Sequence, residues 1–267
     1  MIDSAADGAR LWREIRTVGQ TGSTNGDLLA AARAGEPEGL VLVARSQTAG
    51  RGRLGRAWQS PPGTGLTFSV LLRPAGVPAS ALGWLPLLTG VAVASAVTEV
   101  SAVETRLKWP NDVLVGQAKL GGILAEAWDG AIVIGTGLNV SQRRDELPPT
   151  ATSLALASAN GAAVPPPRLL AAVLASLARW YLAWRDQPDR GDADACGLRA
   201  EYLGRCATVG QEVTVMLPGG QALSGQAVGV DRAGRLEVAS ATGPVQVSAG
   251  DVVHVRPAAG RVAREGR

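Results

Sequence analysis

The sequence predicts an α+β fold, in which a large domain of mixed strands and helices is followed by a small all-β domain. The 267 residues are more than one domain of roughly 150 residues and fewer than two. Up to about residue 204, apolar runs of strand length mix with a run at helical spacing, whereas residues 209–255 alternate with the period of strands. We therefore expect a large domain over residues 1–204 and a small one over 205–267.

The first elements follow from short apolar runs. Residues 39–45 and 65–72 are rich in valine and leucine, which is typical of buried strands. Residues 46–63 between them are polar, rich in glycine and arginine and without a period, and predict a loop. Before them, Thr24 stands three residues ahead of Asp27 and predicts the start of a helix in the manner of a capping box.

A long uncharged stretch over residues 74–98 is the one candidate for a membrane span. Its prolines, glycines and hydroxyl residues favour instead a buried helix that is entered near Trp84. Residues 112–115, 121–128 and 131–140 predict strands separated by tight glycine turns, and residues 167–184 predict a helix.

Turn signals divide the C-terminal part into four or five short strands. They lie at residues 218–220, 231–234 and 242–244, and this spacing suggests a small barrel. The tail after Arg256 is expected to be frayed.

Composition excludes several classes of protein. Hydrophobic residues make up 46% and charged residues 18%, which fits neither disorder nor a fibrous repeat. The net charge of +3 gives no argument for nucleic acid. A single histidine, His254, excludes a multi-histidine metal site. Cys196 and Cys206 form no zinc or redox motif, and the N-terminus lacks a secretory signal, so we expect a cytoplasmic protein with reduced thiols.

The segment over residues 47–58, QTAGRGRLGRAW, combines three arginines with three glycines and contains no acidic residue. Glycine lets the backbone approach a ligand, and arginine matches phosphate or carboxylate oxygens. The segment therefore indicates an anion site, plausibly for a nucleotide phosphate. A solvated basic loop and an RNA-binding fragment are the alternatives.

Residues 108–112, KWPND, gather a cation, an amide and a carboxylate around a proline. Lys108 could bind phosphate, while Asn111 and Asp112 could hold a magnesium ion, although an ordinary surface turn has the same composition. Lys119 adds a further cation before two glycines that could offer backbone N–H groups.

Two polar segments complete the candidate site. Residues 23–25, Ser-Thr-Asn, can donate and accept hydrogen bonds at once, as recognition of a neutral polar group requires. Capping of the helix explains Thr24 equally well. Residues 135–139, GTGLN, follow a strand and could bring backbone and an amide against a base or ribose.

Taken in order, STN, QTAGRGRLGR with a following tryptophan, KWPND, KLGGIL-E and G-GLN resemble the catalytic domain of biotin protein ligases. The resemblance covers most of residues 20–140, and the small β domain matches the C-terminal domain of that family. It implies a mixed-sheet, class II synthetase-like catalytic domain with a small C-terminal SH3-like β-barrel. It also implies a reaction that joins biotin to the α-phosphate of ATP and passes it from biotinyl-5′-AMP to a lysine of a biotin carboxyl carrier protein domain of an acyl-CoA carboxylase.

The resemblance also implies roles for individual residues. The expected biotin contacts are Ser23, Thr24, Asn25, Gln47, Arg51, Gly52, Arg53 and Lys119. The expected nucleotide contacts are Arg56, Trp58, Lys108, Asn111 and Asn139, with the loop over residues 141–153 folding over the adenosine. Whether the small β domain touches ATP stays open, with Arg256 at its end as the candidate contact. The expected metal ligands for Mg²⁺ are Asn111 and Asp112, and the expected catalytic residues are Lys119, Arg53, Lys108 and Asp112. Arg53 would guard the mixed anhydride, and Asp112 is the candidate base for the acceptor lysine.

Three other functions remain open at this point. A lipoate or octanoyl ligase of the same fold would not call for the polar residues 23–25 and Gln47. An RNA-binding module predicts stacking aromatic residues, yet aromatic residues are 4% of the chain. A non-catalytic biotin regulator is disfavoured by the intact Lys108, Asp112 and Lys119. About twenty residues precede STN, so neither a DNA-binding domain, as many bacterial relatives carry, nor a membrane contact is expected.

Overall fold

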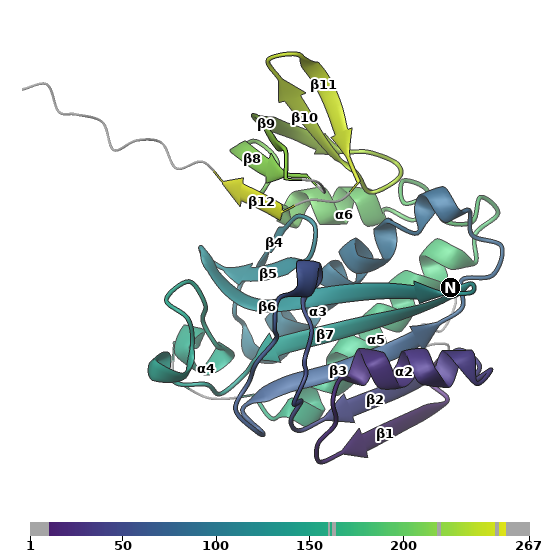
Figure 1. The fold of residues 1–267 in the computed structure, drawn as a ribbon, viewed down its shortest axis with the longest axis vertical. Coiled ribbons are helices and arrows are strands. Elements are labelled where there is room, and N and C mark those ends of the chain that lie inside the picture. Colours follow the sequence, from purple (N-terminus) through teal and green to yellow (C-terminus); the bar gives the residue numbers. More distant parts are fainter. Residues whose placement is uncertain (1–10, 160, 162–163, 218–219, 249–250, 255–267) are drawn as a thin grey trace, which may run out of the picture.

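The computed structural model describes residues 11–159, 161, 164–217, 220–248 and 251–254. They form two sheets joined by helices, with the larger sheet in the N-terminal part and the smaller one in the C-terminal part (Figure 1). The predicted α+β fold class is confirmed.

Seven strands form the larger sheet, in the order β1-β2-β3-β7-β6-β5-β4. Strands β1 and β2 pair in parallel and all the other neighbours pair antiparallel, so the sheet is mixed. In chain order the strands are β1 (Glu14–Val18), β2 (Leu40–Ala44), β3 (Gly65–Leu72), β4 (Arg106–Lys108), β5 (Asp112–Val115), β6 (Ala118–Trp128) and β7 (Ala131–Asn139).

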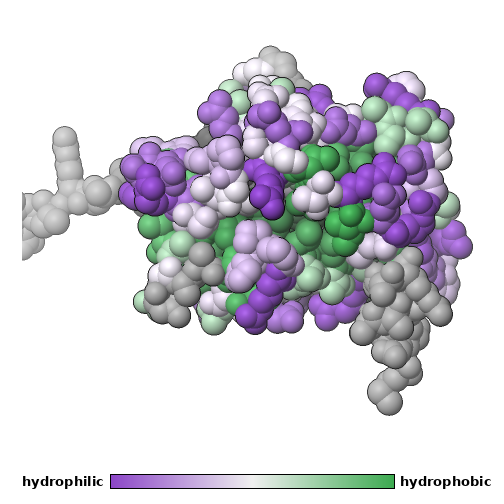
Figure 2. All heavy atoms as spheres, turned by 90° about the horizontal axis from the view of Figure 1, so that it is seen from below, coloured by the Kyte–Doolittle hydropathy of each residue, from purple (hydrophilic) through white to green (hydrophobic). Residues whose placement is uncertain are grey.

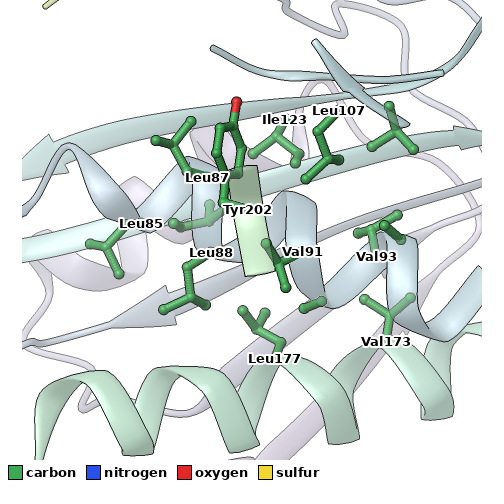
Figure 3. Close-up of a cluster of buried hydrophobic side chains, with 14 of the residues drawn as sticks. Leu85, Leu87, Leu88, Val91, Val93, Leu107, Ile123, Val173, Leu177 and Tyr202 are labelled. Atoms are coloured by element: carbon green, nitrogen blue, oxygen red, sulfur yellow. The ribbon is translucent and has the colours of Figure 1, made fainter. Parts of the chain in front are cut away.

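Helices cover the two faces of this sheet unequally. α3 (Trp84–Ser101) and α5 (Pro166–Arg185) lie on one face and build the main core, shown in Figure 3. On the other face, α2 (Thr24–Arg33) packs over β2, β3 and β7 through a small separate cluster that includes Leu28 and Val133. Because strand side chains alternate between faces, β3 contributes Phe68 to the first cluster and Leu71 to the second.

Helix α3 confirms the buried helix predicted near Trp84. By length and composition alone it could cross a membrane, but 67% of it is buried inside the protein. Its partner α5 matches the helix predicted over residues 167–184. Seen from below, hydrophobic residues lie between hydrophilic ones on the surface (Figure 2), and scattered apolar exposure of this kind is ordinary for a folded protein.

The C-terminal sheet has five antiparallel strands in the order β11-β10-β9-β8-β12, as predicted from the alternating pattern. They are β8 (Glu212–Met216), β9 (Ala222–Val230), β10 (Leu236–Ser240), β11 (Gly243–Val247) and β12 (Asp251–His254). The arrangement is consistent with a small β-barrel domain. Helix α6 (Leu198–Arg205) precedes it; the short elements are α4 (Leu154–Ala157), η1 (Arg53–Gly55), η2 (Ala79–Ala81) and η3 (Arg144–Glu146).

Two tryptophans of the large domain hold the turn between β9 and β10. Trp84 Nε1 donates to Arg232 O at 2.8 Å, and Trp109 Nε1 donates to Gly234 O at 3.0 Å. The backbone approaches so closely that a Cβ on Gly83 would lie 2.5 Å from Ala233 O. The two sheets therefore meet through hydrogen bonds as well as apolar packing.

The local expectations were mostly confirmed, with informative differences. The N-cap of α2 is Ser23, whose Oγ accepts from Gly26 N at 3.4 Å, so the prediction that Thr24 opens the capping box is wrong by one residue. Strand β6 begins three residues earlier than predicted and includes Lys119. The sequence did not indicate β1, because its side chains are mostly exposed and carry no apolar run. The domain division at 204/205 stays a prediction, and the tail after Arg256 lies outside the described residues.

The close contact at Gly83 leads to a stability prediction. Gly83→Ala should lower the free energy of unfolding by about 1–3 kcal/mol, because the new methyl group must displace the backbone of the C-terminal domain. Gly204→Ala in α6 is the matched control, since a Cβ there meets nothing within 4 Å and alanine favours a helix. Urea denaturation measures both; equal stability of Gly83→Ala and the parent would contradict the prediction.

Candidate active site

One cavity of about 310 Å³ lies on the α2 face of the large sheet, where α2, the loop before β3 and strands β4 to β7 meet. It brings together residues from seven separate segments of the chain. All the predicted site residues except Asn139 line it: Ser23, Thr24, Asn25, Gln47, Arg51, Gly52, Arg53, Arg56, Trp58, Lys108, Asn111, Asp112 and Lys119.

At one end, Gln47 is fixed against the start of α2. Thr24 donates to Gln47 Oε1 twice, from its backbone N at 2.8 Å and from Oγ1 at 3.1 Å. Gln47 reaches this place because its segment pairs with the residues before the helix through a bridge to Thr21. With Oε1 occupied, the Nε2 group of the same amide remains to act as a donor.

Asn25 is buried beside this pair and depends on two residues for which the sequence predicted no role. Its Nδ2 donates to Glu126 Oε2 at 2.8 Å, and its Oδ1 lies 2.6 Å from Ser69 Oγ. Glu126 Oε1 also lies 3.5 Å from an Arg51 nitrogen, so one carboxylate connects Asn25 to the arginine loop. Ser69 lies inside strand β3, where no local motif marks it, whereas Glu126, on β6, is the last residue of the KLGGIL-E motif, and the sequence predicted no role for it.

Glycines of β7 make room for these side chains. A Cβ on Gly135 would lie 2.2 Å from Asn25 Oδ1, and one on Gly137 would lie 2.4 Å from the Trp58 ring. The GTGLN segment is thus a flat strand surface on which Asn25 and Trp58 rest. Trp58 Nε1 is buried and has no hydrogen-bond partner among the described residues.

The Gly-Arg segment is a small hairpin that covers the pocket. Trp58 N donates to Gly50 O at 2.9 Å and Gly52 N donates to Arg56 O at 2.7 Å. At its tip Leu54 has a φ of 55° and its side chain is exposed. Arg53 reaches across the pocket and donates to Asn111 Oδ1 at 3.2 Å, which joins the hairpin to the KWPND turn.

The other end of the pocket is cationic. Lys119 Nζ lies 2.6 Å from Asp112 Oδ1, on neighbouring strands β6 and β5. Burial lowers the pKa of Lys108, and the charges of Lys119 and Arg56 lower it further, against the opposing effect of Asp112. Burial also lowers the pKa of Arg53. Lys108 and Lys119 are the two lysines of the whole chain, and both line this pocket.

Gly122 leaves space for the Lys119–Asp112 ion pair. A Cβ at Gly122 would lie 3.3 Å from Lys119 Nζ, closer than most side-chain contacts. The adjacent Gly121 would place a Cβ 2.5 Å from Gly137 O of the next strand. These two glycines therefore serve close packing within the sheet, which differs from the expectation that they expose N–H groups to a ligand.

The predicted metal ligands, Asn111 and Asp112, both line the cationic end of the pocket, and their binding of Mg²⁺ stays a prediction. No group of three or more metal-ligating His, Cys, Asp or Glu residues occurs in the part of the chain that the structure describes. Asp112 is paired with Lys119, and Asn111 uses its Oδ1 for Arg53 and its Nδ2 for Ile123 O. One carboxylate among several cations is too little for Mg²⁺ unless phosphate oxygens accompany the ion.

Asn139 is the predicted site residue that the structure does not bring to the pocket. Its side chain is buried, its Nδ2 donates to Thr152 O at 2.9 Å and its Oδ1 accepts from Gln142 at 3.3 Å. It holds the loop after β7 in place. A nucleotide contact by Asn139 stays a prediction, and Arg256 lies outside the described residues.

The pocket therefore has two chemically distinct ends. Gln47 and residues 23–25 offer neutral donors and acceptors, whereas Lys108, Lys119 and the arginines of the hairpin offer positive charge. A ligand with a neutral polar head and a carboxylate tail, together with a polyphosphate, matches this arrangement.

Comparisons with known proteins agree with this geometry. Residues 21–140 match the biotin/lipoate A/B protein ligase family, and residues 208–255 match the biotin protein ligase C-terminal domain. A biotin–[acetyl-CoA-carboxylase] ligase of Mycobacterium tuberculosis is 45% identical over 92% of this chain and 90% of its own length. One from Paracoccus denitrificans is 31% identical over 87% of this chain and 97% of its own length. The structure of the Aquifex aeolicus biotin protein ligase in complex with biotin and ATP superposes with a TM-score of 0.75 at 28% identity, covering 92% of this chain and 100% of that one.

The shared role of Glu126 leads to a binding prediction. Glu126→Gln should weaken biotin binding roughly tenfold, because a hydrogen bond to a charged group contributes about 1.5–3 kcal/mol and the neutral amide removes the charge that faces both Asn25 and Arg51. Asp129→Asn, at the exposed turn after β6, makes the same chemical change outside the pocket and should leave affinity unchanged. Isothermal titration calorimetry with biotin checks both; equal affinities would remove Glu126 from the site.

Proposed function

The chain belongs to the biotin protein ligase family, and from this premise we propose that it joins biotin to a lysine of a carrier domain through biotinyl-5′-AMP. The observation that carries the proposal is a single pocket with a neutral polar end at Thr24 and Gln47 and a cationic end at Lys108 and Lys119. By similarity to the mycobacterial relative, the acceptor is the biotin carboxyl carrier domain of an acyl-CoA carboxylase.

We propose that the neutral end binds the ureido ring of biotin. That ring is uncharged and has N–H donors and a carbonyl acceptor on different edges, so it needs partners of both kinds. Gln47 supplies an N–H donor because its oxygen is held by Thr24. Ser23 and Asn25 complete the polar end, and Arg51 lies beside it through Glu126.

In the first step a carboxylate oxygen of biotin attacks the α-phosphorus of ATP. A new O–P bond forms, the bond between the α-phosphorus and the bridging oxygen breaks, and pyrophosphate leaves with that oxygen. Both reactants are anionic, so their repulsion is the main obstacle. Lys119, Lys108 and Arg56 surround the meeting point with fixed positive charge, which costs no reorganisation when the transition state forms.

The Lys119–Asp112 ion pair gives Asp112 a role in the second step. When the biotin carboxylate arrives, Lys119 can exchange Asp112 for this new partner, which leaves the Asp112 carboxylate available. The neutral amine of the acceptor lysine then attacks the biotinyl carbonyl carbon, an amide bond forms, the C–O bond to AMP breaks, and Asp112 takes the proton that the amine loses.

Magnesium enters this scheme with ATP. Because Asp112 and Asn111 do not suffice for a resident ion, we propose that Mg²⁺ arrives bound to the triphosphate. In the pocket it would contact a side-chain oxygen of Asp112 and one of Asn111. No step depends on a metal held by the protein alone.

The acceptor needs a way in, and a second cavity offers one. It has a volume of about 620 Å³, shares Arg53 and Asn111 with the pocket, and extends to Gly234 and Arg235 of the C-terminal sheet. We propose that the acceptor lysine enters from this side. Arg53 then stands between the mixed anhydride and solvent, which is where a residue that retains the intermediate must lie.

A lipoate ligase is the second candidate, since the matched family includes lipoate ligases. Lipoate has an apolar dithiolane ring where biotin has its ureido ring. The Nε2 donor of the half-buried Gln47 would lack a partner opposite such a ring, so the pocket favours biotin.

One experiment tests the function directly. An apo carrier domain is incubated with the protein, ATP and Mg²⁺, together with either biotin or lipoate. The mass of the carrier domain is then measured by mass spectrometry. Biotin should add the mass of one biotinyl group at the acceptor lysine, and lipoate should add nothing. Labelling by lipoate alone would overturn the substrate assignment.

The charge role of Lys119 leads to a kinetic prediction. Lys119→Ala should slow pyrophosphate release about 10²–10³-fold, the range for loss of a preorganised electrostatic contact. Arg33→Ala is the control, because it also removes a cation but one that lies over Trp128 outside the pocket. A coupled pyrophosphate assay measures both; an unchanged rate in Lys119→Ala would contradict the charge role.

A further inference from the structure

Tyr202, on α6, carries a buried hydroxyl that the site described above does not use. The residue is 1% exposed, and its Oη has no hydrogen-bond partner among the described residues. Its ring packs edge-on against Trp84 at 6.0 Å, so its orientation is fixed. An unpaired hydroxyl in such a place is costly and calls for an explanation.

A small cavity beside the turn over residues 108–112 supplies an explanation. It has a volume of about 10 Å³ and is lined by Tyr202 together with Lys108, Asn111 and Asp112. That volume is about what a single water molecule needs, and a water held there requires at least two polar partners. The remaining lining is largely apolar, with Leu87, Leu107 and Ile123 around it, and Figure 3 shows the hydroxyl of Tyr202 pointing past the α3 side chains toward the strands.

The turn over residues 108–112 is also held by contacts with the C-terminal part of the chain. Trp109 N donates to Thr208 Oγ1 and Trp109 Nε1 donates to Gly234 O, both at 3.0 Å. These contacts fix the middle of the turn, whereas its two ends, Lys108 and Asp112, are paired with each other in the β4–β5 ladder. A tether from α6 would act on the ends.

We propose that one buried water bridges Tyr202 Oη to the Lys108–Asp112 turn, and that Tyr202 is thereby a positioning residue for the ATP-dependent step. Tyr202 donates to the water, since burial raises its pKa and keeps the hydroxyl protonated. The water donates in turn to an oxygen of the turn, so that no buried polar group is left unpaired. The proposal rests on the proposed function for its kinetic consequence but not for the water itself.

Tyr202→Phe tests the bridge because it removes the hydroxyl and keeps the ring. We expect KM for ATP in adenylate formation to rise about three- to tenfold, or kcat to fall by as much, as expected for the loss of one hydrogen bond. The dissociation constant for biotin should stay unchanged, since Thr24 and Gln47 lie at the other end of the pocket. A merely structural defect would alter the constants for ATP and the dissociation constant for biotin together.

Tyr181→Phe is the matched control, because Tyr181 is the other tyrosine of the chain and is also buried. Its hydroxyl donates to Glu38 at 2.6 Å, away from the pocket. This variant should lower Tm and leave the kinetic constants for ATP unaltered.

Cys206→Ala separates the bridge from a direct contact between Tyr202 and the Cys206 thiol, which also influences the pKa of Tyr202. If Cys206→Ala reproduces the change in ATP constants, the hydroxyl serves the thiol and the proposal is overturned. Unchanged ATP constants in Tyr202→Phe overturn it as well.

A crystal structure supplies a readout that does not depend on activity. The wild-type protein should show density for a water between Tyr202 and the turn, and Tyr202→Phe should lose it. If the wild type forms no biotinyl-5′-AMP but the water is present, the proposed function fails while the bridge stands. If the wild-type cavity shows no density for a water, the proposed bridge is wrong whatever the activity of the protein.

Discussion

The structure of the pocket depends on holding several positive charges close together before any ligand is present. Arg53, Lys108 and Lys119 line one cavity of about 310 Å³ in which Asp112 is the one carboxylate among the described lining residues. Burial lowers the pKa of Lys108, and repulsion from the neighbouring charges of Lys119 and Arg56 lowers it further. Folding of the two sheets offsets this repulsion in advance, so an arriving carboxylate or phosphate relieves it.

The neutral end of the pocket depends instead on side chains that approach the backbone of β7 closely. Asn25 and Trp58 can rest on β7 because Gly135 and Gly137 have no side chains. Glu126 then satisfies the Asn25 amide and extends a weak contact to Arg51. Because these groups hold one another, they are oriented before a ligand enters, which reduces the entropy lost on binding.

The C-terminal sheet contributes to the site by fixing the turn that carries Lys108 and Asp112. The hydrogen bonds of Trp109 to Thr208 and Gly234 reach from this turn into the second sheet. A small domain that adds little lining of its own thus determines where two charged side chains stand. The acceptors of these bonds are the Thr208 hydroxyl and the Gly234 carbonyl oxygen.

The sequence by itself determined the fold class, most strands and helices, and nearly all the side chains that meet in the pocket, because periodicity and short motifs are local properties. It did not reveal β1, the partner Ser69, the role of Glu126 or the place of Asn139, which holds a loop through Thr152 and Gln142. Only the tertiary structure decided these points. The packing of α2 on the paired strands brings residue 25 within hydrogen-bond distance of residues 69 and 126, and no pattern along the chain encodes which distant side chains will face one another.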